Sequence, residues 1–338
     1  MNTHDACLVF DFLGRVPVPL RRAFATALDR LNRKRQEGTP RFRWGSLAGS
    51  EWYRPFDRLL SAERPDEVPA MLASSLQNDI LSLRLQSLYR NGEGASYIED
   101  HPLVEKAGLA DPKRRYELFG LVPFVWLIDK ARLKGSSPPK AWRDLLHPRW
   151  RNEIVFGGWR PHEGAPYREY NTFLLRCLHH EFGDEGLRAF ARNVRLLQHN
   201  VRTAALAGSH STEAGAIAIL PWMQALLNPR RGRTQVVWPS DGALTLPMVY
   251  MVKPEERERL APFMDFLTGP KWASVLIRNA YPPTGRWLGQ AGLPPGASFK
   301  WPGWAHFLER DPEEADRKAA EIFFAAVAWS QEEILSCA

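Results

Sequence analysis

The sequence has few cysteines, no long apolar run and no recognisable export signal. Its three cysteines (Cys7, Cys177 and Cys337) are a sparse, odd set for 338 residues. They favour no disulfide framework, match no zinc motif and fit a reducing compartment. No stretch approaches the roughly 20 apolar residues of a membrane-spanning helix. The first residues lack a basic leader, an apolar stretch and a small-residue cleavage site. We therefore expect a cytoplasmic protein without membrane insertion, or a periplasmic one if a leader has been removed.

The composition is that of an ordinary folded protein with a positive charge. Apolar residues make up 44% and charged residues 25% of the chain, and the formal net charge is +7. This balance excludes general disorder, and the length is sufficient for two lobes. The positive charge favours anionic partners. The basic runs 30–35 and 230–233 are interpreted as solvated surface rather than as contacts to a phosphate backbone.

The segment 118–158 predicts a passage between two lobes. Residues Leu121 to Ile128 are apolar without alternation, which is typical of a strand buried on both faces. Gly135 to Pro139 cannot continue a helix or a strand. A short helix around Trp142 follows, and Ile154 to Phe156 begins a new strand. We interpret this segment as a chain that leaves one lobe on a strand and starts a second lobe.

Strand, loop and helix patterns alternate on both sides of this passage. Such alternation predicts an α/β fold in which each lobe is a mostly parallel sheet flanked by helices. Residues 236–252 read as an extended return path, because their prolines and glycine exclude a helix. We expect a discontinuous N-terminal lobe of residues 1–120 and 245–338, and a second lobe of residues 121–244, hinged by the crossing strands.

Three pieces of the chain carry a family resemblance. Residues 138–150 resemble the segment that opens the second lobe of type II periplasmic solute-binding proteins, the ferric-iron type of ABC transporter component. Residues 238–243 with 246–247 resemble the return strand of these proteins, and residues 268–273 followed by 282–285 resemble a late helix and its closing loop. The resemblance implies two α/β lobes with a ligand in the cleft between them and an ABC permease as partner. We expect no cofactor.

Candidate ligand-binding residues lie where predicted strands end. In open parallel sheets, ligands bind beyond the carboxyl ends of strands and beside helix N-termini. Arginines there suit carboxylate or phosphate groups, whereas serine and asparagine suit neutral or oxyanion ligands. The alternative for each is ordinary capping and turn chemistry. The candidates are Arg15, Ser74, Ser75, Asn78, Trp159, Arg160, His162, His199, Trp222 and Asp241.

The chain departs from the ferric-type proteins at one motif. Those proteins resemble one another in carrying adjacent tyrosines after a strand of the second lobe, where this chain has Pro221–Met223. Tryptophan and methionine are poor ligands for ferric iron. His162, Glu163, Tyr167 and Tyr170 lie close in sequence, but exposed polar residues explain them better than a metal cluster does. We predict no metal site.

The preferred hypothesis is a non-catalytic binding protein whose lobes close on a small anionic or metal-chelate ligand. An enzyme that uses the same cleft is one alternative, with His162, Glu163 and Asp241 as its candidate groups. No phosphate-binding glycine loop, nucleophile elbow or metalloprotease motif occurs. A nucleic-acid-binding regulator is a weaker alternative. The partner is either an ABC permease or a regulatory protein.

Overall fold

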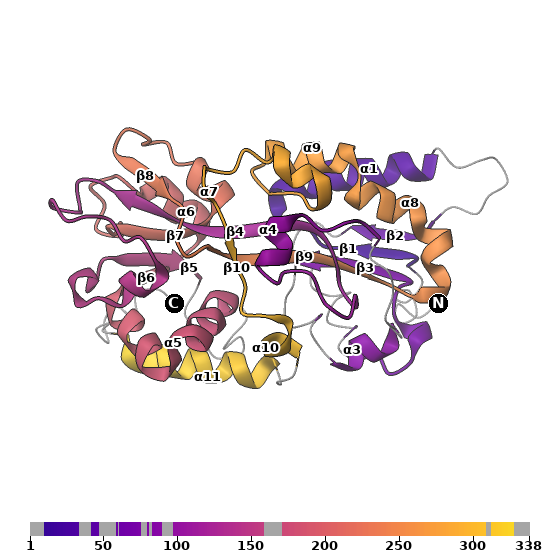
Figure 1. Ribbon diagram of the computed structural model, residues 1–338, viewed down its shortest axis with the longest axis horizontal. Helices are drawn as coiled ribbons and strands as arrows, with labels where there is room; N and C mark the ends of the chain where they lie inside the picture. The colour runs from indigo at the N-terminus through magenta and orange to yellow at the C-terminus, as the bar shows by residue number, and fades with distance from the viewer. Residues whose placement is uncertain are drawn as a thin grey trace, which may run out of the picture. The chain divides into compact units, whose positions relative to one another are not determined.

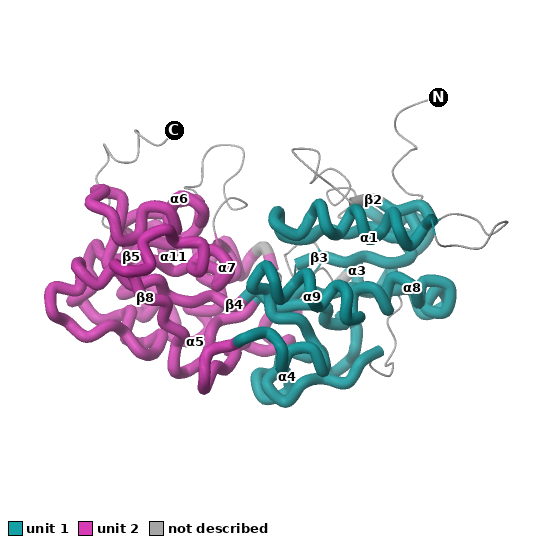
Figure 2. The backbone as a smooth tube through the Cα atoms, turned by 90° about the horizontal axis from the view of Figure 1, so that it is seen from above, with its two compact units in different colours: residues 1–122, 246–292 teal, residues 123–245, 293–338 magenta. Residues whose placement is uncertain are grey.

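The chain folds into two compact units. Unit 1 consists of Met1–Val122 and Leu246–Gly292, and unit 2 of Pro123–Thr245 and Leu293–Ala338 (Figure 2). The chain therefore passes between the units three times, twice within long strands and once after Gly292. The structure is a computed structural model, and it describes residues 10–33, 42–46, 59, 61–75, 80, 83–89, 97–158, 171–308 and 312–327.

The sheet of unit 1 begins with three short parallel strands. β1 lies between β2 and β3 and is parallel to both. The end of β9 completes this sheet and runs antiparallel to β3. The strands are β1 (Phe12–Gly14), β2 (Trp44–Ser46), β3 (Met71–Ser75) and parts of β4 (Glu117–Asp129) and β9 (Ala243–Val252).

Helices cover both faces of the unit 1 sheet. Figure 1 shows α1, α8 and α9 on one face and α3 on the other. Phe24 and Leu28 of α1 are buried because they lie on one face of an amphipathic helix, and Phe12 of β1 stacks on Phe263 of α8 at 4.8 Å. The helices are α1 (Arg21–Arg33), α3 (Leu83–Leu88), α4 (Pro102–Lys106), α8 (Arg257–Thr268) and α9 (Pro270–Arg278), with short 3-10 helices η1 (Val18–Leu20), η3 (Pro65–Glu67), η7 (Pro254–Glu256) and η8 (Gly285–Gln290).

The sheet of unit 2 has a parallel core. β5 lies between β6 and β7 and is parallel to both, while β4 runs antiparallel to β7 and to β8. Every residue of β4 is buried, as its unalternating apolar sequence predicts. The further strands are β5 (Ile154–Gly157), β6 (Val194–Gln198), β7 (Ile217–Pro221), β8 (Thr234–Val237) and β10 (Phe299–Lys300).

Helices also cover both faces of the unit 2 sheet. In Figure 1, α5 and α11 lie on one face and α6 and α7 on the other. α5 is interrupted at Gly183, whose φ of 65° is left-handed. Within the described residues, no helix combines the length and apolar character that crossing a bilayer requires. The helices are α5 (Thr172–Asn193), α6 (Asn200–Leu206), α7 (Trp222–Leu226), α10 (Trp304–Leu308) and α11 (Pro312–Ala326), with η5 (Trp142–Leu146) and η6 (Pro148–Trp150).

The C-terminal segment lies in a different unit from the one expected. The sequence placed residues 245–338 together in the N-terminal lobe, but the chain from Leu293 onwards belongs to unit 2. The reason is the packing of α11 against α5 and β5. Phe323 of α11 contacts Phe156 of β5, with ring centroids 5.6 Å apart, and buried Asp316 pairs with buried Arg176 of α5 at 3.4 Å. These contacts join residues that are more than 130 positions apart, so the sequence pattern alone does not specify them.

Candidate functional site

The first candidate region is the carboxyl edge of the parallel strands in unit 1. Gly14, the last residue of β1, is in register with Ala73 of β3, so Arg15 and Ser74 follow at neighbouring positions. Arg15 Nε donates a hydrogen bond to Ser74 Oγ at 2.8 Å, and the Arg15 backbone N–H donates to Ala73 O at 2.8 Å. The structure therefore brings together two candidates that lie 59 positions apart in the sequence.

Local packing explains why β1 ends where it does. A Cβ on Gly14 would lie 2.6 Å from the ring of Phe24, so only glycine lets α1 pack this closely on the end of the strand. The chain then turns with Arg15 directed into the protein. Arg15 is 3% exposed and Ser74 is fully buried.

A buried guanidinium is an unusual group in a soluble protein. Burying a charge is costly unless hydrogen bonds or opposite charges compensate for it. The hydrogen bond from Arg15 Nε to Ser74 Oγ restrains the orientation of the guanidinium plane. This arrangement is suited to an oxyanion, which guanidinium groups bind with paired hydrogen bonds. Ser75, the last residue of β3, is half-buried and lies opposite Met248 of β9.

The second candidate region is the carboxyl edge of β5, β6 and β7 in unit 2. These parallel strands end at Gly157, Gln198 and Pro221, and the candidates His199 and Trp222 follow the last two. Because β5 is parallel to both neighbours, these three ends meet at one edge of the sheet.

His199 and Trp222 have structural roles at this edge. His199 is exposed and precedes α6, where its Nδ1 accepts a hydrogen bond from Val201 N at 3.3 Å. This is the capping role named above as its alternative. Trp222 is 6% exposed, and its ring packs edge-on against Trp238 at 5.7 Å. Its burial gives the indole a role in packing α7.

Asn200 was not among the candidates, yet it occupies the same edge. A Cβ on Gly157 would lie 2.2 Å from Asn200 Oδ1, so the amide of Asn200 lies directly over the glycine. Asn200 Oδ1 is buried and has no hydrogen-bond partner among the described residues. The signal in the sequence was the glycine pair at the end of β5, but only the parallel pairing of β5 with β6 brings Asn200 to it.

Asp241 supports the structure of unit 2. Its carboxylate accepts a hydrogen bond from Trp142 N, with the two oxygens at 3.2 and 3.3 Å. It also pairs with Lys300 at 3.0 Å, and Lys300 in turn pairs with Glu181 at 2.5 Å. Burial alone would lower the pKa of Lys300, but these hydrogen bonds raise it above its usual value. Asp241 thus ties the start of η5 to β10.

The remaining candidates, and the His/Glu/Tyr group interpreted above as exposed polar residues, lie outside the described residues. They are Asn78, Trp159, Arg160, His162, Glu163, Tyr167 and Tyr170. In the part of the chain that the structure describes, no group of three histidine, cysteine or acidic side chains is placed to hold a metal ion. The successive residues His179, His180 and Glu181 face different partners: Asp184, His306 and Lys300.

The chain matches one protein-family model, and many solved structures are similar to it. A sequence model described as "Bacterial extracellular solute-binding protein" matches residues 86–310. No curated protein matches the sequence. Among solved structures, iron-bound HitA from Pseudomonas aeruginosa is similar to this chain with a TM-score of 0.62 and 13% identity, over 92% of this chain and 98% of that one.

Two further structures show the same fold with other ligands. The Trichodesmium protein IdiA (FutA), in complex with iron and citrate, matches with a TM-score of 0.61 and 14% identity, over 94% of this chain and 99% of that one. AfuA from Actinobacillus pleuropneumoniae, with fructose 6-phosphate bound, matches with a TM-score of 0.58 and 11% identity, over 93% and 98%. The matches confirm the resemblance and the two-lobed α/β fold class predicted from the sequence. The family description does not support the expected cytoplasmic location or a regulatory partner.

Proposed function

We propose, because this chain belongs to the bacterial extracellular solute-binding protein family, that it is the ligand-binding component of an ABC transporter and carries a small anionic solute or a metal chelate. Its partner is then an ABC permease, and its place of work is outside the cytoplasm, as in the periplasmic alternative. Such a protein binds and releases its ligand without changing it, so we propose a carrier rather than an enzyme.

The observation that carries the proposed ligand class is the buried Arg15. Its guanidinium lies at the carboxyl edge of β1 and β3, where related α/β folds bind ligands, and its plane is fixed by Ser74. A guanidinium held in place by a hydrogen bond loses little conformational entropy when it binds an oxyanion. We propose that Arg15 grips a carboxylate or phosphate group and that Ser74 and Ser75 line its surroundings.

Unit 2 has candidate ligand contacts of its own. Asn200 brings a buried amide oxygen without a described partner to the edge beside Gly157. An acceptor of this kind binds a hydroxyl or N–H group of a ligand. From the sequence alone, we also propose ligand contacts for Asn78, Trp159, Arg160 and His162. The contacts made by Trp222 and Asp241 support structural roles for these two residues.

The ligands held by similar structures support the same class. One neighbour is described with iron and citrate and another with fructose 6-phosphate, and both citrate and the sugar phosphate are organic oxyanions. A bare ferric ion is less suited to this chain, because Pro221–Met223 offers no phenolate oxygen. We therefore propose that any metal is carried as a chelate with an organic anion.

The test is calorimetric titration of the full chain with citrate, ferric citrate, inorganic phosphate and fructose 6-phosphate. We expect at least one of these probes to bind. Arg15→Ala should weaken that binding by roughly 10- to 100-fold, because a hydrogen bond to a charged group is worth about 1.5–3 kcal/mol. Arg15→Lys should retain part of the affinity.

The control is Arg286→Ala, since Arg286 is exposed and stacks on Trp287 in unit 1. Thermal melting separates loss of binding from loss of folding, and Ser74→Ala is a second, gentler test of the same contact. Equal affinity of wild type and Arg15→Ala for the bound probe would contradict the proposal. So would binding of neutral sugars in preference to all four anions.

A further inference from the structure

One end of unit 2 carries two basic turns side by side. It is the end at which β4 finishes and β8 begins: Asp129 of β4 is paired with Thr234 of β8. The turns beyond these residues meet, because Lys130 N donates to Arg233 O at 3.0 Å. β7 also begins here, opposite Ile128 of β4. This end is therefore opposite to the edge that carries Asn200.

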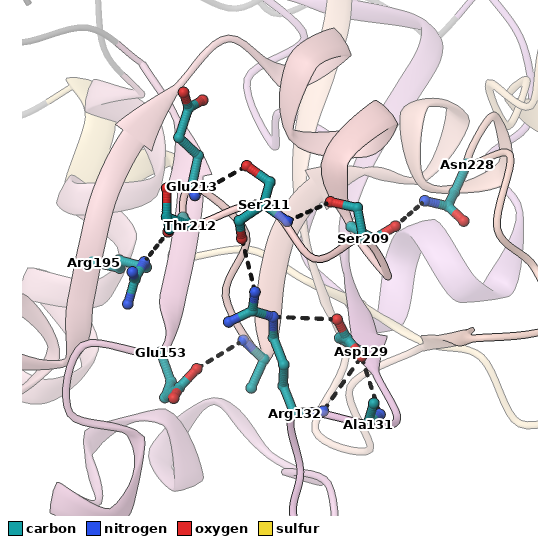
Figure 3. Close-up of polar contacts among 12 residues, drawn as sticks. Asp129, Ala131, Arg132, Glu153, Arg195, Ser209, Ser211, Thr212, Glu213 and Asn228 are labelled. Carbon is teal, nitrogen blue, oxygen red and sulfur yellow. Dashed lines mark hydrogen bonds and ion pairs between the residues drawn. The ribbon is translucent and has the colours of Figure 1, made fainter.

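The two turns are strongly basic. No acidic residue occurs in residues 130–143 or 226–237. The nearest one, Asp129, is 3% exposed and is engaged by Arg132 at 3.4 Å (Figure 3). Because Asp129 is buried and engaged by Arg132, its carboxylate does not neutralise the solvent-facing cations of these turns. The solvent-facing cations are Lys130, Lys134, Arg231 and Arg233, with Arg230 half-buried.

Two leucines are exposed beside these cations. Leu226 is 36% and Leu227 is 66% exposed, at the end of α7 and just before the arginines. Arg231 Nη2 donates to Leu226 O at 2.8 Å, so the turn folds back on the end of the helix. Asn228 fixes the base of the turn by donating hydrogen bonds to Ala204 O and Ala207 O. The leucines and arginines are thus presented by a well-anchored segment.

We propose that this basic–leucine patch, formed by Leu226, Leu227, Arg230, Arg231 and Arg233 with Lys130 and Lys134, binds the surface of an anionic lipid membrane. Guanidinium groups bind phosphate oxygens in pairs, and exposed leucines enter the boundary between headgroups and acyl chains. Two leucine side chains are too little apolar surface for the core of a stable protein interface. They are sufficient for a shallow membrane contact that is reinforced by charge.

This contact differs from membrane insertion and from ligand binding. The patch lies on turns, and the chain remains on the membrane surface. It would keep a carrier close to a membrane without engaging the carboxyl edge of β5, β6 and β7. The patch and the proposed ligand contacts share no residue, so each can be tested without the other.

The experiment is co-sedimentation of the full chain with vesicles of phosphatidylcholine alone and of phosphatidylcholine mixed with phosphatidylglycerol. We expect binding only to the mixed vesicles, and we expect it to weaken as salt is added. Arg231→Glu with Arg233→Glu should reduce it by at least roughly 30-fold, at about 1 kcal/mol per arginine. Leu226→Ser with Leu227→Ser should reduce it by roughly tenfold or more.

The matched control reverses the same number of charges elsewhere. Lys271 and Arg278 are exposed on α9 of unit 1, and Lys271→Glu with Arg278→Glu should leave most of the vesicle binding in place. Thermal melting of each variant checks that the fold is retained. The patch variants should also bind citrate or phosphate probes as the wild type does.

Three results would overturn the proposal. The first is equal binding to both kinds of vesicle, or to neither. The second is an equal loss in the control variant, or no loss in the leucine variant, because either would reduce the effect to general attraction between opposite charges. The third is binding to native membrane vesicles but not to protein-free mixed vesicles, which would assign the patch to a membrane protein.

Discussion

Replacement of Asn228 by alanine should destabilise unit 2 more than any surface substitution. Asn228 is 2% exposed, and its side chain makes four hydrogen bonds. It donates to Ala204 O at 2.7 Å and Ala207 O at 3.0 Å. It accepts from Arg230 N at 2.8 Å and Thr234 Oγ1 at 3.0 Å. The side chain thereby joins α6, the turn after α7 and the start of β8.

The expected magnitude follows from counting these bonds. At a net value of about 1 kcal/mol each, Asn228→Ala should lower the free energy of unfolding by about 4 kcal/mol. Asn228→Asp keeps the shape and the two accepting positions, but it places a carboxylate against two carbonyl oxygens. Its loss should therefore be as large near neutral pH and smaller in acid, where the protonated side chain can donate one hydrogen bond.

The assay is urea unfolding followed by tryptophan fluorescence, at neutral and acidic pH. Asn279→Ala is the matched control, because Asn279 is half-buried and its side chain donates a hydrogen bond to Val275 O at the end of α9. Its cost should stay near 1 kcal/mol. If Asn228→Ala cost no more than Asn279→Ala, the four hydrogen bonds of Asn228 would not stabilise unit 2 to the extent expected.

Two further predictions concern the edge beside Asn200 and the dependence of stability on pH. In Gly157→Ala, the new Cβ would lie 2.2 Å from Asn200 Oδ1, so the amide must move; titration of a bound anionic probe should show roughly tenfold weaker affinity. Gly232→Ala, where a Cβ meets nothing within 4 Å, should change it little. Hydrogen bonds from two backbone N–H groups at the start of η5 lower the pKa of Asp144, so its stabilisation is present above the unfolded pKa of about 4 and is lost as the pH falls through the folded value. Asp144→Asn should therefore lower the melting temperature at neutral pH, and the difference should shrink in strong acid.

Most of the architecture could be predicted because it depends on local patterns. The unalternating apolar run within β4 indicated a strand buried on both faces, and all of β4 is buried. Phe24 and Leu28 stand four positions apart, which is a helical spacing, and both are buried on one face of α1. Such patterns specify an element and the face that it buries, but not the surface that it packs against. The placement of α11 in unit 2 depends on contacts with α5 and β5, which are far away in the sequence.

The candidate residues could be predicted only where the sequence showed where a strand ends. Arg15 and Ser74 followed from the rule that ligands bind beyond the carboxyl ends of parallel strands, and the register of β1 and β3 places them in contact. The same rule selected His199, which caps α6, and Trp222, whose ring packs against Trp238. Polar and aromatic residues are common in both roles. Ligand-binding and structural residues differ in their burial and in the residues that they contact, and neither property can be read from the sequence.

Native mass spectrometry of the freshly purified chain, before and after addition of citrate, inorganic phosphate and fructose 6-phosphate, tests whether this chain carries a small anion that Arg15 binds. We predict a species heavier than the chain by the mass of one small anion or anionic chelate, which is absent or much reduced in Arg15→Ala. A chain that shows only its own mass with and without these probes, or an adduct retained equally by Arg15→Ala, would contradict the claim.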